Sequence, residues 1–405
     1  MLFNSLQFAL FFPTVTAAYF LCPRHLRWIL LLVASYAFYM AWRWEYGVLL
    51  ATMSAVDWYV ALRIERATNA SRKRLWLLVT VLGNFGMLCV FKYFNLFNAT
   101  AAEAAGAVGL HWPIPLLSIF LPVGISFHTF QTVGYAVDVY RGALAAERNP
   151  LRFALFVSFF PQLVAGPIER ATNLLPQLQR PTDFDHPYGS RSISEIWSRW
   201  HISLSTWFRD YLYFPLGGNR VSFARWSFNV TLVFLVSGIW HGAEWRFALW
   251  GLMHGALLVL DRVTLPLRDR VAAALGLEWT GLRAPIATAL TLVLWTLTLV
   301  PFRAESMADA AYVYAHLPSG WSRLGELEAL GWFLDRVHLD PAMFALCLAF
   351  LPLVYAVDAA RRRAAWVEWM RARPTAARWA VDYVVLFAIL FMGHWADMPF
   401  VYFQF

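Results

Sequence analysis

Two polar, histidine-bearing stretches lie inside an otherwise apolar chain. Residues 197–219 read WSRWHISLSTWFRDYLYFPLGGN, and residues 237–245 read SGIWHGAEW within a strongly apolar run. A bilayer tolerates ionisable side chains only where protein encloses them or where they line a wet cavity, so such residues mark function. His201 and His241 lie in these two stretches. The sequence therefore predicts a chemical site that is embedded in a membrane.

The composition supports a membrane protein. Of the 405 residues, 60% are hydrophobic and only 14% are charged, whereas a soluble domain carries charge on about a quarter of its residues. Apolar runs near the length of a membrane span recur along the whole chain, which argues against a large soluble core. We expect an all-α polytopic membrane protein with about 9–11 transmembrane helices and some re-entrant or interfacial helices, in a single domain over residues 1–405.

The predicted spans follow these apolar runs. They are 5–21, 28–42, 46–64, 75–96, 115–138, 153–165, 226–241, 245–261, 284–302, 341–357 and 379–396. The run 153–165 is short and contains Pro161, so we predict a re-entrant or buried segment there.

The loop charges predict the orientation of the chain. The basic loops are 63–74, 141–152, 219–225 and 361–374. Such loops face the cytoplasm, which places the acidic stretch 303–340 and the uncharged-to-acidic stretch 97–114 outside. This pattern accounts for the net charge of +8 without a nucleic-acid partner. Three dispersed cysteines show no ligand spacing, so we expect no metal site.

Helical spacing along the first polar stretch predicts one apolar face. Its members are Trp200, Leu204, Trp207 and Tyr211. His201 and Ser205 lie on an adjacent stripe one turn apart, so the hydroxyl can contact the imidazole. Arg199, Arg209 and Asp210 make the stretch too polar to span lipid. Two alternatives stay open: an interfacial helix with snorkelling arginines, or a broken helix around a cavity.

The second stretch places His241 at the end of an apolar run. About fifteen residues at about 1.5 Å each cover about 22 Å, which is less than the hydrocarbon core, so we expect His241 deep in the bilayer. A buried neutral imidazole can take a proton from a hydroxyl and return it. A hydrogen-bonded structural role is the alternative, and we favour that role for His254. His128, in the middle of a predicted span, is a candidate for lining a cavity.

Longer stretches around the two histidines resemble the membrane-bound O-acyltransferase family. They are SEIWSRWHISLSTWFRDYLYFPLGGNR (194–220) and SGIWHGAEWRFALWGLMHG (237–255), supported by FKYFNLF (91–97), LPVGISFHTFQTVGYAVDVYRG (121–142), FPQLVAGPIER (160–170) and PFVYFQF (399–405). The resemblance is distributed from the first helix to the last residue. It is strongest to the bacterial polysaccharide branch that is typified by alginate O-acetyltransferases.

This resemblance implies a reaction. The family moves an acyl group from a cytoplasmic donor, through a tunnel between tilted helices, to an acceptor at the other face of the membrane. In this branch the implied donor is acetyl-CoA, with no bound cofactor. The implied acceptor is a hydroxyl of an exopolysaccharide or of peptidoglycan, reached directly or through a periplasmic esterase-like acetyltransferase partner. The implied location is the bacterial inner (cytoplasmic) membrane, with the lipid bilayer as a further partner.

The resemblance also implies residue roles. His241 corresponds to the family's essential histidine and is expected to remove the proton of the acceptor hydroxyl, while His201, at the second polar position, hydrogen-bonds the thioester carbonyl or the oxyanion. Arg199 and Arg209 are expected to attract the phosphates of coenzyme A. The remaining candidates for donor or substrate binding are Ser205, Asp210, Trp240 and His254.

One region departs from the family pattern. Relatives carry several more membrane segments after the PQLQRP stretch (176–181), whereas here TDFD runs almost straight into HPY, which predicts an internal shortening near 182–187. We therefore keep a second hypothesis, a non-catalytic or degenerate scaffold that docks a periplasmic transferase. A transporter of an acyl donor or a glycan precursor is a third hypothesis, which the lack of visible repeat symmetry disfavours.

Overall fold

The computed structural model describes residues 5–41, 43–118, 124–163, 184–277 and 281–317, with isolated positions outside these ranges. Within these ranges the regular structure is helical and no β-strand occurs. The chain forms two compact units: Met1–Thr182, Ser203–Gly251 and Trp395–Phe405 in the first, and Asp183–Ile202 and Leu252–His394 in the second. The predicted spans 341–357 and 379–396 lie outside the continuously described residues.

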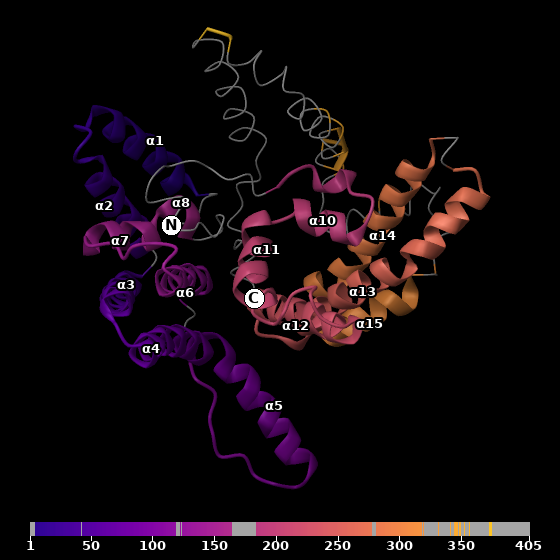
Figure 1. Ribbon diagram of the computed structural model, residues 1–405, viewed down its shortest axis with the longest axis horizontal. Coiled ribbons are helices and arrows are strands. Elements are labelled where there is room, and N and C mark those ends of the chain that lie inside the picture. Colours follow the sequence, from indigo (N-terminus) through magenta and orange to yellow (C-terminus); the bar gives the residue numbers. More distant parts are fainter. Residues whose placement is uncertain are drawn as a thin grey trace. The chain divides into compact units, whose positions relative to one another are not determined.

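The α-helices of the first unit are labelled in Figure 1, and the short π-helices η1 and η3 lie among them in the sequence. They are α1 (Leu6–Leu21), α2 (Arg27–Met40), α3 (Trp44–Arg66), α4 (Ala70–Leu88), η1 (Cys89–Tyr93), α5 (Phe94–Ala107), α6 (Ile125–Arg141), α7 (Pro150–Ser158), α8 (Phe160–Leu163), α11 (Ile202–Phe208), η3 (Arg209–Tyr213) and α12 (Phe223–His241). The second unit holds η2 (Pro187–Gly189), α10 (Ile193–Arg199), α14 (Arg283–Arg303) and α15 (Met307–His316). Helix α13 (Trp245–Ala274) begins in the first unit and continues in the second.

Five helical segments in the described part of the chain are long and apolar enough to cross a membrane. They are Trp44–Arg66, Ala70–Ala107, Phe223–His241, Trp245–Ala274 and Arg283–Arg303. These segments confirm an all-α polytopic membrane protein. The total of 9–11 spans stays a prediction, because part of the chain that carries predicted spans is not described.

A buried polar network joins α3, α4 and α6 in the first unit. The amide of Asn84 donates to a carboxylate oxygen of Asp57 at 2.8 Å, and the hydroxyl of Thr132 donates to the Asn84 carbonyl oxygen at 3.0 Å. Asp57 is only 4% exposed. Polar groups inside a membrane protein need such internal partners, so the network fixes the register of the three helices.

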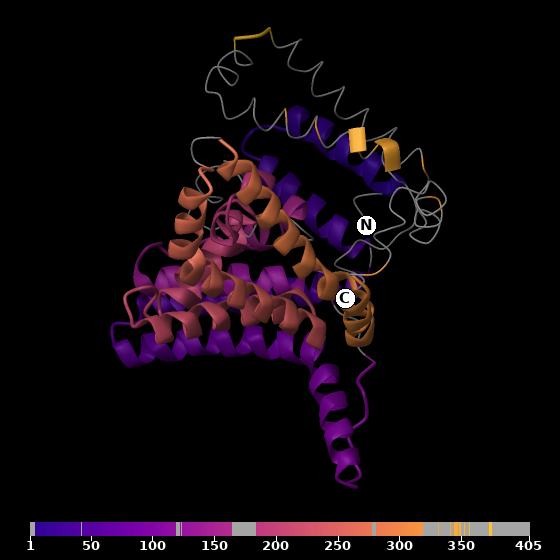
Figure 2. The same ribbon diagram turned by 90° about the vertical axis from the view of Figure 1, so that its right-hand side faces the viewer.

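The predicted span 75–96 ends before its helix does, and part of the stretch 97–114, which we predicted to lie outside the membrane, is helical. Helix α4 continues through the π-helix η1 into α5, which ends only at Ala107, and the helix bends where η1 lies (Figures 1 and 2). The sequence of α5, FNLFNATAAEAAGA, is rich in alanine, which has the highest helix propensity of all residues. The low hydropathy of α5 ended the predicted span at residue 96, but the helix continues through these residues.

The predicted span 115–138 begins too early. Helix α6 starts only at Ile125, and the described part of HWPIPLLS before it contains no helix. Its two prolines lack an N–H donor and disfavour helical geometry in the residue before them. The segment runs back along α5 (Figure 2), where the amide of Asn95 donates to the Leu117 carbonyl at 2.8 Å.

The short run 153–165 contains a break, as its length and proline suggested. Helix α7 has nine residues, about 14 Å by helical rise, which is less than half of a hydrocarbon core. It ends before Phe159, and α8 adds only four residues. Phe153 and Phe156 are 0% and 2% exposed, so the segment is buried in the first unit.

Helices α12 and α13 contact each other through glycines. A Cβ at Gly238 would lie 2.2 Å from the carbonyl oxygen of Phe247, and a Cβ at Gly251 would lie 2.2 Å from that of Phe234. Small residues let the backbones of two membrane helices approach this closely. The two glycines therefore hold the end of α12 against the start of α13.

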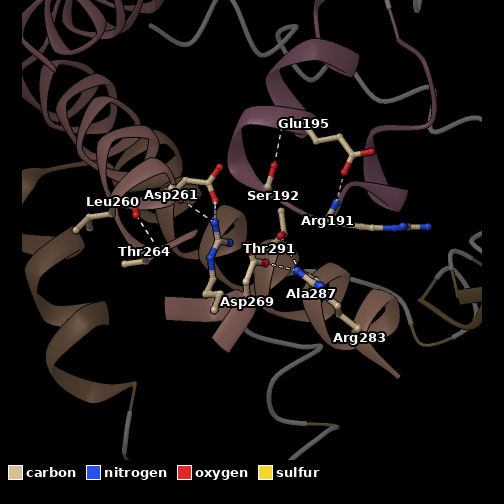
Figure 3. A network of polar contacts seen from close by, with 11 residues as sticks. Arg191, Ser192, Glu195, Leu260, Asp261, Thr264, Asp269, Arg283, Ala287 and Thr291 are labelled. Atoms are coloured by element: carbon tan, nitrogen blue, oxygen red, sulfur yellow. Dashed lines mark hydrogen bonds and ion pairs between the residues drawn. The ribbon is translucent and has the colours of Figure 1, made fainter. Parts of the chain in front are cut away.

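The second unit contains the continuation of α13, which the predicted run 245–261 underestimates. The helix has 30 residues, about 45 Å by helical rise, so it is longer than a hydrocarbon core. Its later turns carry charges: Arg268 pairs with Asp261 at 2.7 Å, and Asp269 pairs with Arg283 at the start of α14 (Figure 3).

We expect Gly251→Ala to lower the melting temperature of the purified protein in detergent. The added methyl group collides with main-chain atoms of α12, and such overpacking costs about 1–3 kcal/mol. Gly83→Ala on α4 is the matched control, since no atom lies within 4 Å of its added Cβ and alanine favours the helix. Equal melting temperatures for the two variants would contradict the close contact.

Candidate active site

His241 is the last residue of α12, and the next residue leaves helical geometry. Gly242 is extended (φ −156°, ψ 153°), and a Cβ there would lie 2.0 Å from the Phe247 ring. Phe247 is fully buried, so only glycine fits at this position without displacing it. The close contact between Gly242 and the Phe247 ring therefore determines where α12 ends, and with it the position of His241.

Aromatic rings hold the imidazole of His241. The Trp240 ring lies 4.8 Å away and the Trp250 ring 5.0 Å away, both nearly perpendicular to the imidazole. His241 is 9% exposed. The structure thus places this predicted site residue in a buried position against two indole rings. Because α12 is 19 residues or about 28 Å long, the depth of His241 in a bilayer depends on tilt and stays a prediction.

Trp240 contributes a buried donor beside His241. It is 3% exposed and its ring packs against Phe127 and Phe130, with centroid distances of 5.3 and 5.7 Å. Its indole N–H has no hydrogen-bond partner among the described residues. An indole N–H can only donate, and a buried donor without a partner requires an explanation. A carbonyl or hydroxyl oxygen of a substrate is one group that it can bind.

Two residues that the sequence reasoning did not single out contact the end of α12. The ammonium of Lys92 donates to the carbonyl oxygens of Trp240 and His241, at 2.6 and 3.3 Å, and the Tyr93 hydroxyl donates to that of Ile239 at 2.9 Å. Both lie in the π-helix η1. A lysine inside an apolar span was the available signal, because such charges are rare unless they serve a function.

The first polar stretch is a broken helix, and its place around a cavity or at the membrane interface stays a prediction. Helix α10 ends at Arg199, and His201 has φ of 48°, in the left-handed region that non-glycine residues seldom adopt. Helix α11 follows, and η3 then widens into π geometry. The single apolar face is therefore wrong: Leu204 and Trp207 join the core of the first unit, whereas Trp200 packs against Trp295 in the second.

His201 lies in an aromatic environment within the second unit. Its ring stacks on Phe184 with centroids 6.0 Å apart, and Phe184 contacts Trp200 edge-on at 5.0 Å. His201 is half-buried. The predicted contact between His201 and Ser205 stays a prediction. Ser205 is half-buried in α11 of the first unit, and its role stays a prediction.

The arginines predicted to attract coenzyme A already have partners. Arg199 pairs with Glu195 on α10 and donates to the carbonyl oxygen of His186 at 3.4 Å. Arg209 pairs with Asp210 at 2.8 Å. An arginine has five N–H donors, so these contacts leave donors for phosphate oxygens.

Figure 3 shows how α10 begins: the Ser192 hydroxyl accepts from the Glu195 N–H, and the Glu195 carboxylate accepts from the N–H of Arg191.

His254 has a partner at each ring nitrogen. The indole N–H of Trp197 donates to Nδ1 at 3.3 Å, so the proton sits on Nε2, 3.0 Å from the hydroxyl oxygen of Thr298. That hydroxyl donates in turn to the Trp295 carbonyl at 2.6 Å. His254 is 0% exposed. Such a closed chain of hydrogen bonds is typical of a structural histidine.

His128 is buried on α6, at 1% exposure. It lines a small pocket with Tyr39, Met53 and Ile125, and its two ring nitrogens have no hydrogen-bond partner among the described residues. The structure therefore agrees with the predicted cavity-lining position.

The candidate residues divide between the units. Trp240 and His241 lie in the first unit, with Ser205, Arg209 and Asp210. His201 lies in the second, with Arg199 and His254.

Comparisons with known proteins point to one family. Residues 180–298, which include both histidine stretches, match the family described as MBOAT, membrane-bound O-acyltransferase family. The chain is 32% identical to a probable alginate O-acetylase of Pseudomonas aeruginosa, over 88% of this chain and 81% of that protein. It is 28% identical to a peptidoglycan O-acetyltransferase of Helicobacter pylori, over 65% and 70%. A teichoic acid D-alanyltransferase of Streptococcus thermophilus is 38% identical over 22% and 24%.

The internal shortening stays a prediction, and the alignment with the alginate O-acetylase is consistent with it. The alignment has 442 positions, but 88% of 405 residues is about 356, so about 86 positions (442 less 356) stand opposite no residue of this chain. The predicted place of the shortening, near 182–187, lies partly outside the described residues.

We expect Thr298→Val to lower the melting temperature while leaving the turnover of the folded enzyme unchanged. Valine keeps the shape of threonine but leaves the Nε2–H of His254 without an acceptor, which costs about 1 kcal/mol inside a membrane protein. Thr298→Ser retains the hydroxyl and is the control. The structural interpretation of His254 fails if Thr298→Val melts like the native protein yet turns over substrate more slowly.

Proposed function

Because the chain belongs to the membrane-bound O-acyltransferase family, we propose that it moves an acetyl group from cytoplasmic acetyl-CoA to a hydroxyl of a cell-envelope polysaccharide. The chain is a multi-pass membrane O-acyltransferase. The proposal adds the acyl donor, the acceptor class and the location, which is the bacterial inner membrane.

The observation that carries the proposal is the setting of His241. His241 ends a helix that is long and apolar enough to span the membrane, its imidazole packs against two indole rings, and the residue is 9% exposed. An imidazole can take a proton from a hydroxyl and return it, as general-base catalysis needs.

The proposed reaction balances without a further cofactor. The imidazole of His241 takes the proton of the acceptor hydroxyl, and the hydroxyl oxygen attacks the thioester carbonyl carbon. The C–S bond then breaks, and the thiolate of coenzyme A takes the proton back from the imidazolium. The products are an acetyl ester and free coenzyme A. We assign the binding of the carbonyl oxygen, as negative charge develops on it, to His201, and donor or substrate contacts to Trp240.

The names of the relatives support the acceptor class. Alginate O-acetylases and the peptidoglycan O-acetyltransferase are named for acetyl transfer to sugar polymers, whereas teichoic acid D-alanyltransferases are named for an aminoacyl group. Similarity to the acetyl-transferring relatives extends over 88% and 65% of the chain, and that to the D-alanyltransferase over only 22%. This favours acetyl. A periplasmic acetyltransferase is the proposed partner where the polysaccharide does not take the group directly.

We expect His241→Ala to reduce acetyl transfer from labelled acetyl-CoA, measured in proteoliposomes, by at least about 100-fold, because it removes the general base. His201→Ala is expected to lose about 10- to 1,000-fold, through weaker oxyanion stabilisation. His25→Ala, an exposed residue before α2, is the control and keeps native turnover. If His241→Ala still supports polysaccharide acetylation in cells while deletion of the whole chain does not, the scaffold hypothesis replaces this mechanism.

A further inference from the structure

We infer that Lys92 and Tyr93 are positioning residues for His241, which they hold by hydrogen-bonding the main chain at the end of α12. This inference rests on the proposed role of His241 as the general base. According to this inference, the π-helix η1 fixes the position and orientation of the His241 imidazole.

The end of α12 needs hydrogen-bond donors from outside the helix. The last four carbonyl groups of any α-helix lack a partner within that helix. Here Gly242 is extended, so the chain does not curl back to supply one in the manner of a glycine cap. In a membrane-spanning helix, carbonyl groups left without donors are costly, because lipid offers none.

Helix η1 supplies these donors to three consecutive carbonyls. Tyr93 bonds the carbonyl oxygen of Ile239 at 2.9 Å, and Lys92 bonds those of Trp240 and His241 at 2.6 and 3.3 Å. Tyr93 is 7% exposed and packs with Ile239 in one apolar cluster. The three residues whose carbonyls are bonded include the proposed base and the residue immediately before it.

A second contact ties the same helix to the residues beyond the site. The indole N–H of Trp245, at the start of α13, donates to the Thr100 hydroxyl on α5 at 3.3 Å. The α4–η1–α5 helix therefore contacts both sides of the turn that carries His241. Displacement of His241 along the α12 axis breaks hydrogen bonds on both sides.

The positive charge of Lys92 suits its position at the C-terminal end of α12. The C-terminus of a helix carries partial negative charge, which an ammonium stabilises. Only two of the 33 basic residues in the chain are lysine, at 73 and 92. An ammonium is compact and presents three donors, so it can bond two adjacent carbonyls where a planar guanidinium needs more room.

The π geometry explains how two neighbouring residues serve one helix end. Successive residues of a regular α-helix point about 100° apart, so Lys92 and Tyr93 would diverge in it. The wider turn of η1 lies at this contact, and π-turns inside α-helices are frequently found at functional sites. We attribute to this turn the convergence of both side chains on α12.

The test compares Lys92→Met, Lys92→Arg and Tyr93→Phe with Lys73→Met in proteoliposomes. Lys73 lies near the start of the same helix, where its ammonium packs over the Tyr140 ring at 5.4 Å, far along the sequence from η1. We expect Lys92→Met to lower kcat by about 10- to 100-fold, as a misplacement of about 1 Å can do, with KM for acetyl-CoA within about twofold of native. Lys92→Arg restores part of kcat, Tyr93→Phe shows a smaller loss, and Lys73→Met is native.

A second measurement separates this inference from the proposed function. The His241 resonance in ¹³C-histidine-labelled protein in detergent, assigned by its absence in His241→Ala, is expected to shift in Lys92→Met and to stay unchanged in Lys73→Met. An unshifted resonance with native kcat in Lys92→Met overturns the positioning role. Full activity of His241→Ala overturns the general-base role instead, whether or not the resonance shifts. A fall in melting temperature in Lys92→Met with kcat unchanged shows that the contact only stabilises the fold.

Discussion

The main-chain carbonyls at the end of α12 impose the constraint on which the site depends. A helix that ends among apolar surroundings must find donors within the protein, since lipid has none to offer. Lys92 and Tyr93 provide them from another spanning helix, and Gly238 allows α13 to approach closely from a third direction. These contacts hold His241 through its main chain.

Two buried histidines in neighbouring helices illustrate why burial alone does not identify a catalytic residue. His254 is more deeply buried than His241, but its ring is bonded at both nitrogens, to Trp197 and to Thr298. Its hydrogen-bonding capacity is used up by the fold. His241 lies against the rings of Trp240 and Trp250, and Lys92 donates to its main-chain carbonyl oxygen. Sequence cannot make this distinction, because the partners of His254 lie 57 and 44 residues away.

Apolar runs predicted two of the regular α-helices closely. The predicted run 226–241 corresponds to α12, and 284–302 agrees with α14 within one residue at each end. Errors lie where charged or small residues continue a helix beyond its apolar run, as in α13 and α5, and where the regular geometry changes. Periodicity assumes 3.6 residues per turn, so it could not predict the π-turns η1 and η3 or the left-handed backbone of His201. Both the broken helix at His201 and the donors in η1 come from such irregular segments.

The predicted internal shortening concerns the enclosure of the site more than the position of His241. The groups that fix His241 come from α4–η1–α5, α12 and the start of α13, and all of them are present in this chain. The resemblance places the missing segments beside the reaction chamber, where they would form part of its wall. A chain without those segments would keep the proposed general base and the hydrogen bonds that hold its main chain. Water exclusion and the fit of the acceptor are then the properties in which this protein should differ most from its longer relatives, because those depend on the wall rather than on the helix end.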